Sequence, residues 1–509
     1  MKSVKFILGA LLLVMAATSC SNVNGKLEKM IPRDAKGVVC IKVPEILEKA
    51  EIADNDYELP AALKKVVEAN PKSQFCTILA DLPNSGIDPK HNMYVFFTGK
   101  TYKMVTLVPI DDTDKAVASI EKMTDNRFAE MAGVKYIGVG DTYYVMGDGV
   151  LLAGSLSRLV DAKTAVAEAC RILDSEQPSI ADNDDAKECL KSDGDVSAYF
   201  DMNGIGSVLN KSKTYRSLVQ KMPLITVFTE SDIKAVVCDF KIDKTTADLT
   251  AKIKVDDHSD YVQLLSATLG QPSNDFLKAI PNSMDYIMAM SVNGEALARL
   301  PQMQQLTAAM AKMPGMKALD LAGIISTVNG PLAVGLAKDP YLQGEWNAVI
   351  AAKTANAQSV LDRIIDFARA MGQAPQKYGN EYIYQYNNKQ VNVGVIGDVV
   401  YVKMLDYEQT EGYAYELPDV RDFFAANPIG IYVRAKAGNT SGILNFGITR
   451  YVDGKGFFYT EKDDDNAAQV LLGILCSAKG GDQSSDGADD DDLDMNSITG
   501  AGDLMQPVD

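Results

Sequence analysis

The residue types that most often carry out catalysis and bind metals are scarce in this sequence. Among its 509 residues only two are histidines, His91 and His258. A Ser-His-Asp or Cys-His arrangement would have to use one of them, and an HExxH zinc motif cannot be built. His91 lies in the polar stretch "IDPKHNMYVFF", ahead of an expected strand and without a nucleophile motif around it. We therefore assign no catalytic residue and expect a protein that is not an enzyme.

His258 lies in an acidic cluster, "VDDHSD". Together with Asp256, Asp257 and Asp260 it could ligate a metal ion. Two other junctions between an expected strand and helix, "PIDDTDK" and "EKDDDN", repeat the acidic cluster without a histidine. Aspartates at a helix start accept hydrogen bonds from free N–H groups, worth about 1 kcal/mol per cap. None of the clusters has EF-hand spacing. We therefore interpret them as helix caps and predict no metal and no cofactor.

The glycine-rich stretches "GVGDTYYVMGDG" and "AGNTSG" match neither a phosphate-binding loop nor a dinucleotide fingerprint. Paired carboxylates for glycoside cleavage stay open among 68 acidic residues, although the single tryptophan, Trp346, offers little of the aromatic platform common in sugar sites. One alternative hypothesis is thus a carboxylate-based hydrolase acting on glycan or peptidoglycan.

Four methionines recur along an expected helix in "LPQMQQLTAAMAKMPGMKALDLAGII", at positions 303, 310, 313 and 316. Met303, Met310, Met313 and Met316 fit a flexible core face, or an adaptable apolar groove for a peptide or lipid. The second interpretation gives another alternative, a periplasmic carrier or chaperone.

The N-terminus has the pattern of an export signal. Lys2 and Lys5 precede the apolar run "FILGALLLVMAA", which is shorter than the helix of about 20 residues that spans a bilayer. The run ends in "ATSC", which is similar to the lipobox of bacterial lipoproteins, with Ala17 where leucine is commonest. That similarity implies cleavage before Cys20 and a lipid on its thiol. We expect a protein anchored to a membrane by this lipid.

Net charge and cysteine spacing indicate which partners the protein can have and which state its thiols are in. With 68 acidic and 50 basic residues, the net charge of −18 disfavours nucleic acid as a partner. The other six cysteines show no CxxC spacing, and Cys40 and Cys238 fall inside apolar strand runs. We expect them to be buried free thiols.

Two stretches far apart have the same pattern: "IPRDAKGVVCIKVPEILEKA" from Ile31 and "IPNSMDYIMAMSVNGEALARL" from Ile280. Each has an Ile-Pro start, an alternating strand and a helical segment. Four further strand, turn and helix features follow each copy in the same order, and Gly147-Asp148 matches Gly397-Asp398 as a hairpin turn. This order predicts a tandem duplication.

The alternating strands and short turns favour an α+β fold of antiparallel sheets, covered on one face by helices. We predict a signal peptide over 1–19, a lipidated tether over 20–29, and α+β halves over 30–270 and 271–478. The acidic tail, 479–509, lacks apolar periodicity and is expected to be disordered.

Together, the lipobox, the Ile-Pro-x-Asp-Ala opening at Ile31 and the second Ile-Pro strand resemble an uncharacterised family of Bacteroidota lipoproteins, known as a domain of unknown function. The resemblance implies an outer-membrane location and no particular activity. In that group, surface-exported lipoproteins carry acidic residues after the cysteine, whereas this chain has "CSNVNGK". The periplasmic face is therefore favoured. We expect a non-catalytic envelope protein that binds a protein or lipid ligand or has a structural role.

Overall fold

The computed structural model describes residues 23–477, except 54–55, 72, 99, 158–159, 203–231, 257–258, 313–315, 339–345, 387–388, 406–411, 438–439, 451 and 463–464. Cys20, His258, Met313 and the acidic tail therefore lie outside the described residues. Within the described part, none of the helices has the length and hydropathy that crossing a bilayer requires.

We call the described residues up to 270 the first half and those from 271 the second half. The strands of the first half are β1 (Gly37–Ile41), β2 (Met93–Phe97), β3 (Tyr102–Pro109), β4 (Ala129–Met131), β5 (Val134–Val139), β6 (Thr142–Gly147), β7 (Val150–Leu156), β8 (Val196–Asp201), β9 (Ala235–Ile242) and β10 (Thr246–Lys254). Those of the second half are β11 (Tyr286–Asn293), β12 (Val328–Lys338), β13 (Trp346–Thr354), β14 (Gln376–Tyr378), β15 (Glu381–Tyr386), β16 (Lys389–Ile396), β17 (Val399–Leu405), β18 (Ile429–Ala437), β19 (Thr440–Arg450) and β20 (Asp453–Thr460).

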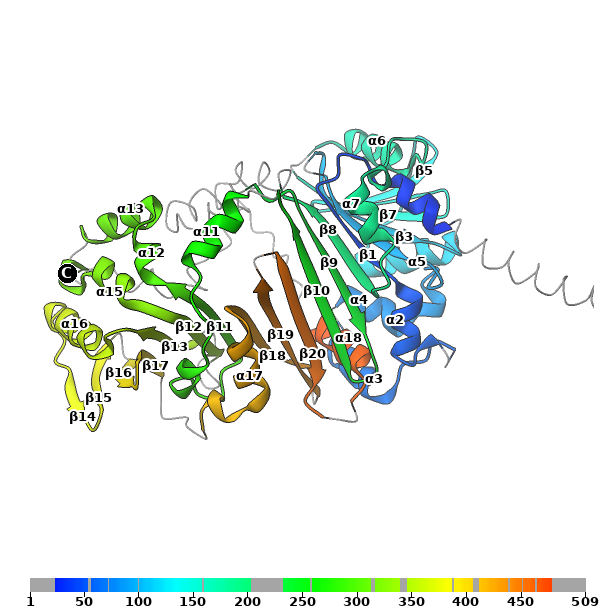
Figure 1. Cartoon of the computed structure of the whole chain (residues 1–509). Helices are drawn as coiled ribbons and strands as arrows, with labels where there is room; N and C mark the ends of the chain where they lie inside the picture. The colour runs from blue at the N-terminus through cyan, green and yellow to red at the C-terminus, as the bar shows by residue number, and fades with distance from the viewer. Residues whose placement is uncertain are drawn as a thin grey trace, which may run out of the picture.

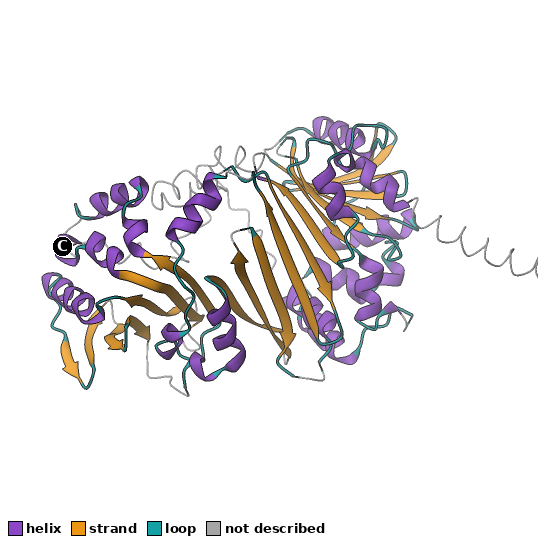
Figure 2. Ribbon diagram, in the orientation of Figure 1, coloured by secondary structure: helices purple, strands orange, loops and turns teal. Residues whose placement is uncertain are grey.

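These strands form one antiparallel sheet of 20 strands that crosses the molecule (Figures 1 and 2). Their pairings give the spatial order β4-β5-β6-β7-β3-β2-β1-β8-β9-β10 for the first half. The second half continues β20-β19-β18-β11-β12-β13-β17-β16-β15-β14. Each strand of the first half thus has a counterpart in the second half, whose label is higher by ten, as for β1 and β11. The two members of each such pair lie equally many strands away from the β10–β20 junction. The predicted duplication and α+β class are confirmed, and the two sheets prove to be one, joined by the β10–β20 pair.

The repeated Ile-Pro motif makes the same contacts in both halves. Ile31 accepts the N–H of Ile180 at 3.0 Å, and Ile280 accepts the N–H of Ala414 at 2.8 Å. The following prolines form isolated antiparallel bridges, Pro32 with Ser179 and Pro281 with Tyr413. The motif therefore ties the segment ahead of each first strand to the segment that later returns to its side.

The helices of the first half are residues 23–30, α2 (Val43–Lys49), α3 (Ala61–Ala69), α4 (Gln74–Ala80), η2 (Leu82–Asn84), α5 (Thr113–Thr124), α6 (Ala162–Leu173), η3 (Ile180–Asp182), α7 (Asp184–Leu190) and α11 (Asp260–Thr268). The second half has η5 (Asp275–Lys278), α12 (Gly294–Ala298), α13 (Pro301–Met310), α14 (Met316–Leu319), α15 (Leu321–Thr327), α16 (Ala357–Ala370), η6 (Ala414–Glu416), α17 (Pro418–Ala426) and α18 (Ala467–Ser477).

Helices cover both faces of the sheet in the first half, which corrects the expectation of one covered face. On one face, residues 23–30, α6 and α7 pack against Val38 and Cys40 of β1. On the other face, α2 to α5 and α18 pack in a second core that includes Val108, Leu151 and Ile242. A strand with apolar residues in both alternating sets can be buried on both sides, so β1 is a central strand with two covered faces.

Polar caps begin the helices that follow the strands. The Asp112 carboxylate accepts from the N–H groups of Asp114 and Lys115 at 3.1 and 3.0 Å, which confirms capping at the start of α5. At α11 and α18, however, the caps are not the predicted aspartates but Ser259, which lies within its acidic cluster, and Asn466, which follows Asp465. Side chains of this kind satisfy the free N–H groups of the first turn.

The two halves exchange contacts through their last helices. Helix α18 follows β20 of the second half, lies over β18, β19 and β20, and packs against α2, α3 and α4 of the first half. Asn466 and Gln469 donate to the carbonyls of Lys49 and Ala50 at the end of α2, at 2.8 and 3.1 Å. Helix α11, which follows β10 of the first half, packs in turn against α12 and β11. The halves are therefore joined by exchanged helices as well as by a shared sheet.

Candidate functional site

A large apolar cavity lies in the first half, between the sheet and α2, α4, α5 and α18. Its volume is about 650 Å³. The wall on the sheet side comes from β1, β2, β3, β6, β7, β8 and β9, and the opposite wall from the helices. The lining residues include Ile41, Ile46, Leu47, Phe75, Ile78, Leu79, Met93, Thr106, Val108, Ile120, Met123, Leu151, Ala153, Val196, Phe240, Ile242, Leu471, Leu472, Ile474 and Leu475.

The cavity wall carries no charged side chain among the described residues. Ser85, one of its few hydroxyl groups, is already used locally: it donates to the carbonyl of Leu82 at 2.7 Å and accepts the Ile87 N–H at 3.2 Å. The other hydroxyls of the wall belong to Thr106, Ser119 and Tyr144. A wall of this composition selects ligands by shape and hydrophobicity and gives a charged group no partner.

The volume of the cavity lies in the range of small-molecule pockets, which measure roughly 300–1,000 Å³. One side of the cavity is open to water. An apolar occupant that displaces this water would gain roughly 25 cal/mol per Å² of apolar surface that it buries.

The position of α5 over the cavity depends on a close backbone approach at Gly86. Gly86 has a φ of +74°, and a Cβ built on it would lie 2.4 Å from the backbone N of Ala116. Its carbonyl also accepts from the Asp111 N–H at 3.2 Å, just ahead of the helix. Only glycine combines this φ with this clearance. The turn at Gly86 therefore fixes the distance between α5 and the sheet.

The cavity has a rim where α4 and α18 meet. Phe75 on α4 and Leu475 on α18 line the cavity and are also exposed, by 39% and 57%. The residue after each of them is a buried cysteine, and the Cys76 thiol donates to the carbonyl of Cys476 at 3.6 Å. Burial raises the pKa of the Cys476 thiol to about 12, and its hydrogen bond with Cys76 adds to the effect. This contact joins α4 to α18 at the residues that follow Phe75 and Leu475. The described cysteines are free thiols, of which Cys40, Cys76, Cys189 and Cys476 are buried as expected, whereas Cys170 and Cys238 are half-buried.

A buried ion pair fastens α2, one wall of the cavity, to the sheet. Asp195 is only 3% exposed, and both of its oxygens lie 2.7 Å from the Lys49 ammonium. It also accepts the Ile242 N–H at 2.6 Å. The carboxylate is thus fully used in holding α2 beside β9, and it has a structural role.

The second half contains a buried polar cluster around Glu381. This carboxylate accepts from the Tyr401 hydroxyl at 2.6 Å, from Asn392 at 2.9 Å and from Lys403 at 3.4 Å. Burial alone would raise the pKa of Glu381, but these hydrogen bonds outweigh it and lower the pKa. The pKa of the Tyr401 hydroxyl is raised, because the group is buried and because it donates to the negatively charged Glu381. A carboxylate with three donors stays ionised, so the cluster stabilises the β15–β17 region.

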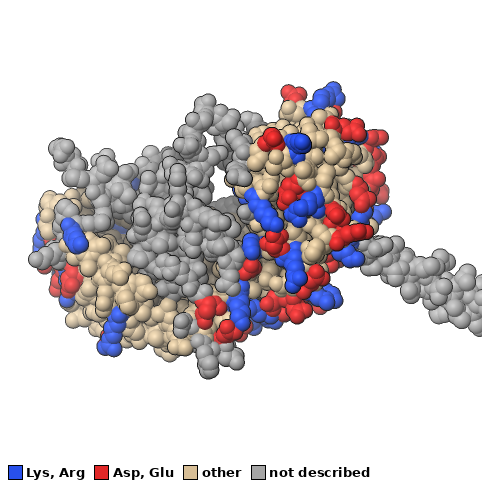
Figure 3. Space-filling view, turned by 90° about the horizontal axis from the view of Figure 1, so that it is seen from above, with Lys and Arg blue, Asp and Glu red and all other residues tan. Residues whose placement is uncertain are grey.

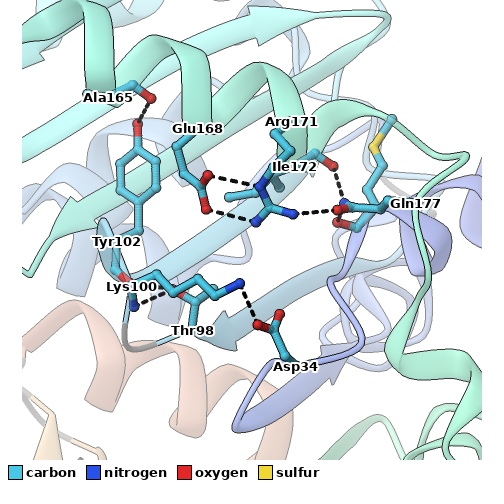
Figure 4. A network of polar contacts seen from close by, with 10 residues as sticks. Asp34, Thr98, Lys100, Tyr102, Ala165, Glu168, Arg171, Ile172 and Gln177 are labelled. Carbon is cyan, nitrogen blue, oxygen red and sulfur yellow. Dashed lines mark hydrogen bonds and ion pairs between the residues drawn. The ribbon is translucent and has the colours of Figure 1, made fainter.

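On the face opposite the cavity, polar contacts hold α6 against the N-terminal segment (Figure 4). Arg171 forms a two-pronged pair with Glu168 at 2.8 and 2.9 Å and also donates to Gln177. The Tyr102 hydroxyl donates to the carbonyl of Ala165 at 2.9 Å. Seen from above, acidic and basic side chains of the described residues are interspersed over the visible surface of the first half (Figure 3).

The histidine and aspartate sites considered from the sequence have no catalytic or metal-binding arrangement in the described residues. The Nδ1 atom of His91 lies 2.8 Å from Asp88, which also accepts the Lys90 N–H within the same turn. Asp256 pairs with Lys234 at 2.5 Å, whereas Asp257 and His258 lie outside the described residues. In the described part of the chain, no three His, Cys, Asp or Glu side chains gather as metal ligands.

The methionines of the predicted groove lie apart from the cavity. Met303 on α13 and Met316 on α14 are buried, Met310 is half-buried, and Met313 lies outside the described residues. The cavity is instead lined by Met93 and Met123. The methionine groove therefore stays a prediction, and the cavity itself was not predicted from the sequence. One signal for it was present, because α18 is an apolar helix without a charge over eleven residues.

Comparison with known proteins identifies the family of this chain but indicates no activity. No curated protein matches this chain. Two solved structures, crystal forms I and III of TP0453, are 12% and 11% identical and have TM-scores of 0.28 and 0.29. Each covers 45% of this chain, and 79% and 80% of those chains are covered, a likeness too distant to support any inference. The profile of a domain of unknown function, DUF4836, matches residues 27–360, which span the first half, the cavity strands and much of the second half. The chain therefore belongs to the DUF4836 family.

Proposed function

We propose that this protein is a non-catalytic, lipid-anchored protein of the bacterial envelope that holds the hydrocarbon chain of a lipid in its apolar cavity. The observation that carries the proposal is the cavity of about 650 Å³, whose described lining residues are without charge. A hydrocarbon chain needs no hydrogen-bond partners and benefits from each apolar contact, by roughly 0.8 kcal/mol per buried CH₂ group.

The location is part of the same proposal. The lipobox-like "ATSC" supports a lipid on Cys20 in the outer membrane, and "CSNVNGK" favours the periplasmic face. Such an anchor keeps the cavity near a source of lipid. Of the alternatives from the sequence, a carrier is closest to this proposal, with the cavity in place of the methionine groove as its binding site.

The experiment is the recovery of bound lipid. The lipoprotein is purified from its native envelope in mild detergent, extracted with organic solvent and examined by mass spectrometry. We expect a stoichiometric lipid or fatty acid that is released without cleavage of the anchor on Cys20. Thr106→Phe, which places a ring in the cavity from β3, should abolish this co-purification.

The duplication supplies a matched control for that variant. Thr106 pairs with Ala153 on β7, and Ile350 pairs with Val402 on β17, so the two hold equivalent places in their halves. Ile350 does not line the cavity and is exposed. Ile350→Phe should therefore keep the bound lipid. If extracts of the unaltered protein contain no lipid beyond the anchor, or if Thr106→Phe retains it, the proposal is wrong.

A further inference from the structure

The rim of the cavity has the composition of a surface that enters a lipid bilayer. Phe75 and Leu475 are among the exposed large hydrophobic side chains, and both belong to helices without a charged residue, "QFCTILA" and "AAQVLLGILCS". Charged residues make up 23% of the chain, so two uncharged helices side by side at an opening are unusual for its surface. Exposed apolar groups that gather around one opening mark an interaction site.

The side chains around the rim also suit a membrane surface. Helix α3 packs against both α4 and α18. It carries exposed Lys64 and Lys65, with Glu68 as its acidic residue. Lysines beside an apolar surface can reach the headgroups while the apolar groups enter the interface. This arrangement suits a phospholipid bilayer better than a folded protein partner.

The length of the tether limits how far the first half can lie from the membrane. Only residues 21 and 22 separate Cys20 from Val23, the first described residue, which is helical. The three steps from Cys20 to Val23 span at most about 11 Å. That helix is fixed to the first half, since Leu27 and Met30 are fully buried and Asn24 accepts the N–H of Asn92, next to the cavity residue Met93. A lipid on Cys20 would thus hold the half that contains the cavity against the bilayer.

We infer that the rim formed by Phe75 and Leu475 docks into a phospholipid bilayer and that the cavity takes up its hydrocarbon chain directly from the membrane. The inference rests on the proposed function for its ligand but concerns the route, and the route can be tested by itself. The two apolar side chains enter the interface, so that the chain of a lipid passes between α4 and α18 without crossing water.

The test uses the single tryptophan of the chain. In a Trp346→Phe background, Leu475→Trp places the only indole on the rim, and Tyr378→Trp places it on the tip of the β14–β15 hairpin, where Tyr378 is 79% exposed. Each full-length lipoprotein is reconstituted into vesicles of phosphatidylethanolamine and phosphatidylglycerol that contain brominated acyl chains. We expect strong quenching for Leu475→Trp and little for Tyr378→Trp. Equal and weak quenching at both sites would overturn the inference.

A second measurement links docking to uptake. The double variant Phe75→Ser with Leu475→Ser should load a fluorescent lipid from vesicles roughly tenfold more slowly, since two apolar anchors are lost. When the lipid is supplied in detergent, where docking plays no part, this variant should show no such tenfold delay, although its final occupancy should fall somewhat because both side chains also line the cavity. The matched control, Met371→Ser with Phe457→Ser, removes side chains that are 40% and 38% exposed elsewhere and should load normally. Loading of the rim variant at the unaltered rate would contradict docking, whereas failure of every protein to bind the lipid even in detergent would contradict the proposed function.

Discussion

At the scale of single residues, the buried carboxylate of Asp195 gives a prediction about the stability of the first half. It is almost fully buried, its partner Lys49 is about one-third exposed, and it also accepts the Ile242 N–H. Removing one partner of a buried pair costs about 3–5 kcal/mol, and the partial exposure of Lys49 places Asp195→Ala near the lower end.

Urea denaturation checks this prediction as a loss of about 3 kcal/mol in the free energy of unfolding. Asp148→Asn is the control, because Asp148 pairs with Lys26 at the surface. Surface pairs contribute about 0–1 kcal/mol, so this variant should unfold almost like the unaltered protein. Similar losses for the two variants would show that the Asp195 pair has no special role.

Asp275 gives a prediction about pH. Hydrogen bonds from Lys353 and then Lys278 hold the pKa of this carboxyl well below its ordinary value of 3.8. A pKa lowered by folding stabilises the folded state above the unfolded pKa of about 3.9, and this contribution is lost as the pH falls toward the folded pKa. Asp275→Asn should therefore lower the urea midpoint at pH 7 and lose this effect progressively below pH 4. A difference from the unaltered protein that does not change with pH would rule out the ionised carboxylate as its cause.

At the scale of elements, the start of α18 decides how firmly that helix closes the cavity. Asn466 accepts the Gln469 N–H as an N-cap at 3.1 Å and donates to the Lys49 carbonyl of α2 at 2.8 Å. Asn466→Ala should cost about 1 kcal/mol for the cap and about 1 kcal/mol for the tie. Asn356→Ala removes only a cap, at α16, and should cost about half as much. Hydrogen exchange and urea denaturation measure both losses, and equal losses would show that the tie contributes nothing.

Elements were predictable from the sequence where the determining contacts are local. Alternation along Val38 to Ile41, the Asp112 cap and the repeated strands needed only neighbours within a few residues. The hairpin turns were matched one residue out of register: the structure turns at Asp148-Gly149, since Gly147 pairs with Val150, and at Gly397-Asp398, since Ile396 pairs with Val399. Both turns have two residues, but the Gly-Asp order of the second is reversed to Asp-Gly in the first, so matching by residue type shifted the alignment by one.

The cavity was not predictable, because its walls meet only through long-range packing. Cys76 and Cys476 touch across 400 residues of sequence. Nothing in the local pattern of α18 indicates that it packs on the first half and not on its own. Sequence periodicity gives the apolar face of a helix, but it does not identify the surface that the face will cover.

At the scale of the whole molecule, the two halves share a topology but differ in how their sheets are covered. The cavity lies between the sheet of the first half and α2, α4 and α5, with α18 of the second half as a further wall. In the second half, strands β11, β12, β13 and β18 each leave one large apolar side chain exposed: Met288, Leu332, Ile350 and Ile431. Three of them are close neighbours, since Met288 pairs with Ile431 and with Val334, and Val334 pairs with Ile350. The two halves therefore have the same strand order, whereas the described residues on these four strands of the second half leave large apolar side chains exposed.

The shared sheet and the exchanged helices predict that neither half is stable alone. A chain cut between residues 270 and 271 would expose the β10 edge, which pairs with β20 over seven residues from Thr246 to Lys252. It would also remove α18 from the core that contains Leu63, Leu79 and Ile242. Unpaired edges and uncovered apolar faces favour aggregation. We expect each fragment to be insoluble when expressed alone, and the two to co-purify as a folded complex when expressed together.

The intact chain should melt in a single calorimetric transition with equal calorimetric and van't Hoff enthalpies, because the two halves unfold together. Two separate transitions, or a soluble first half with its own cooperative melting curve, would show that the halves are independent domains.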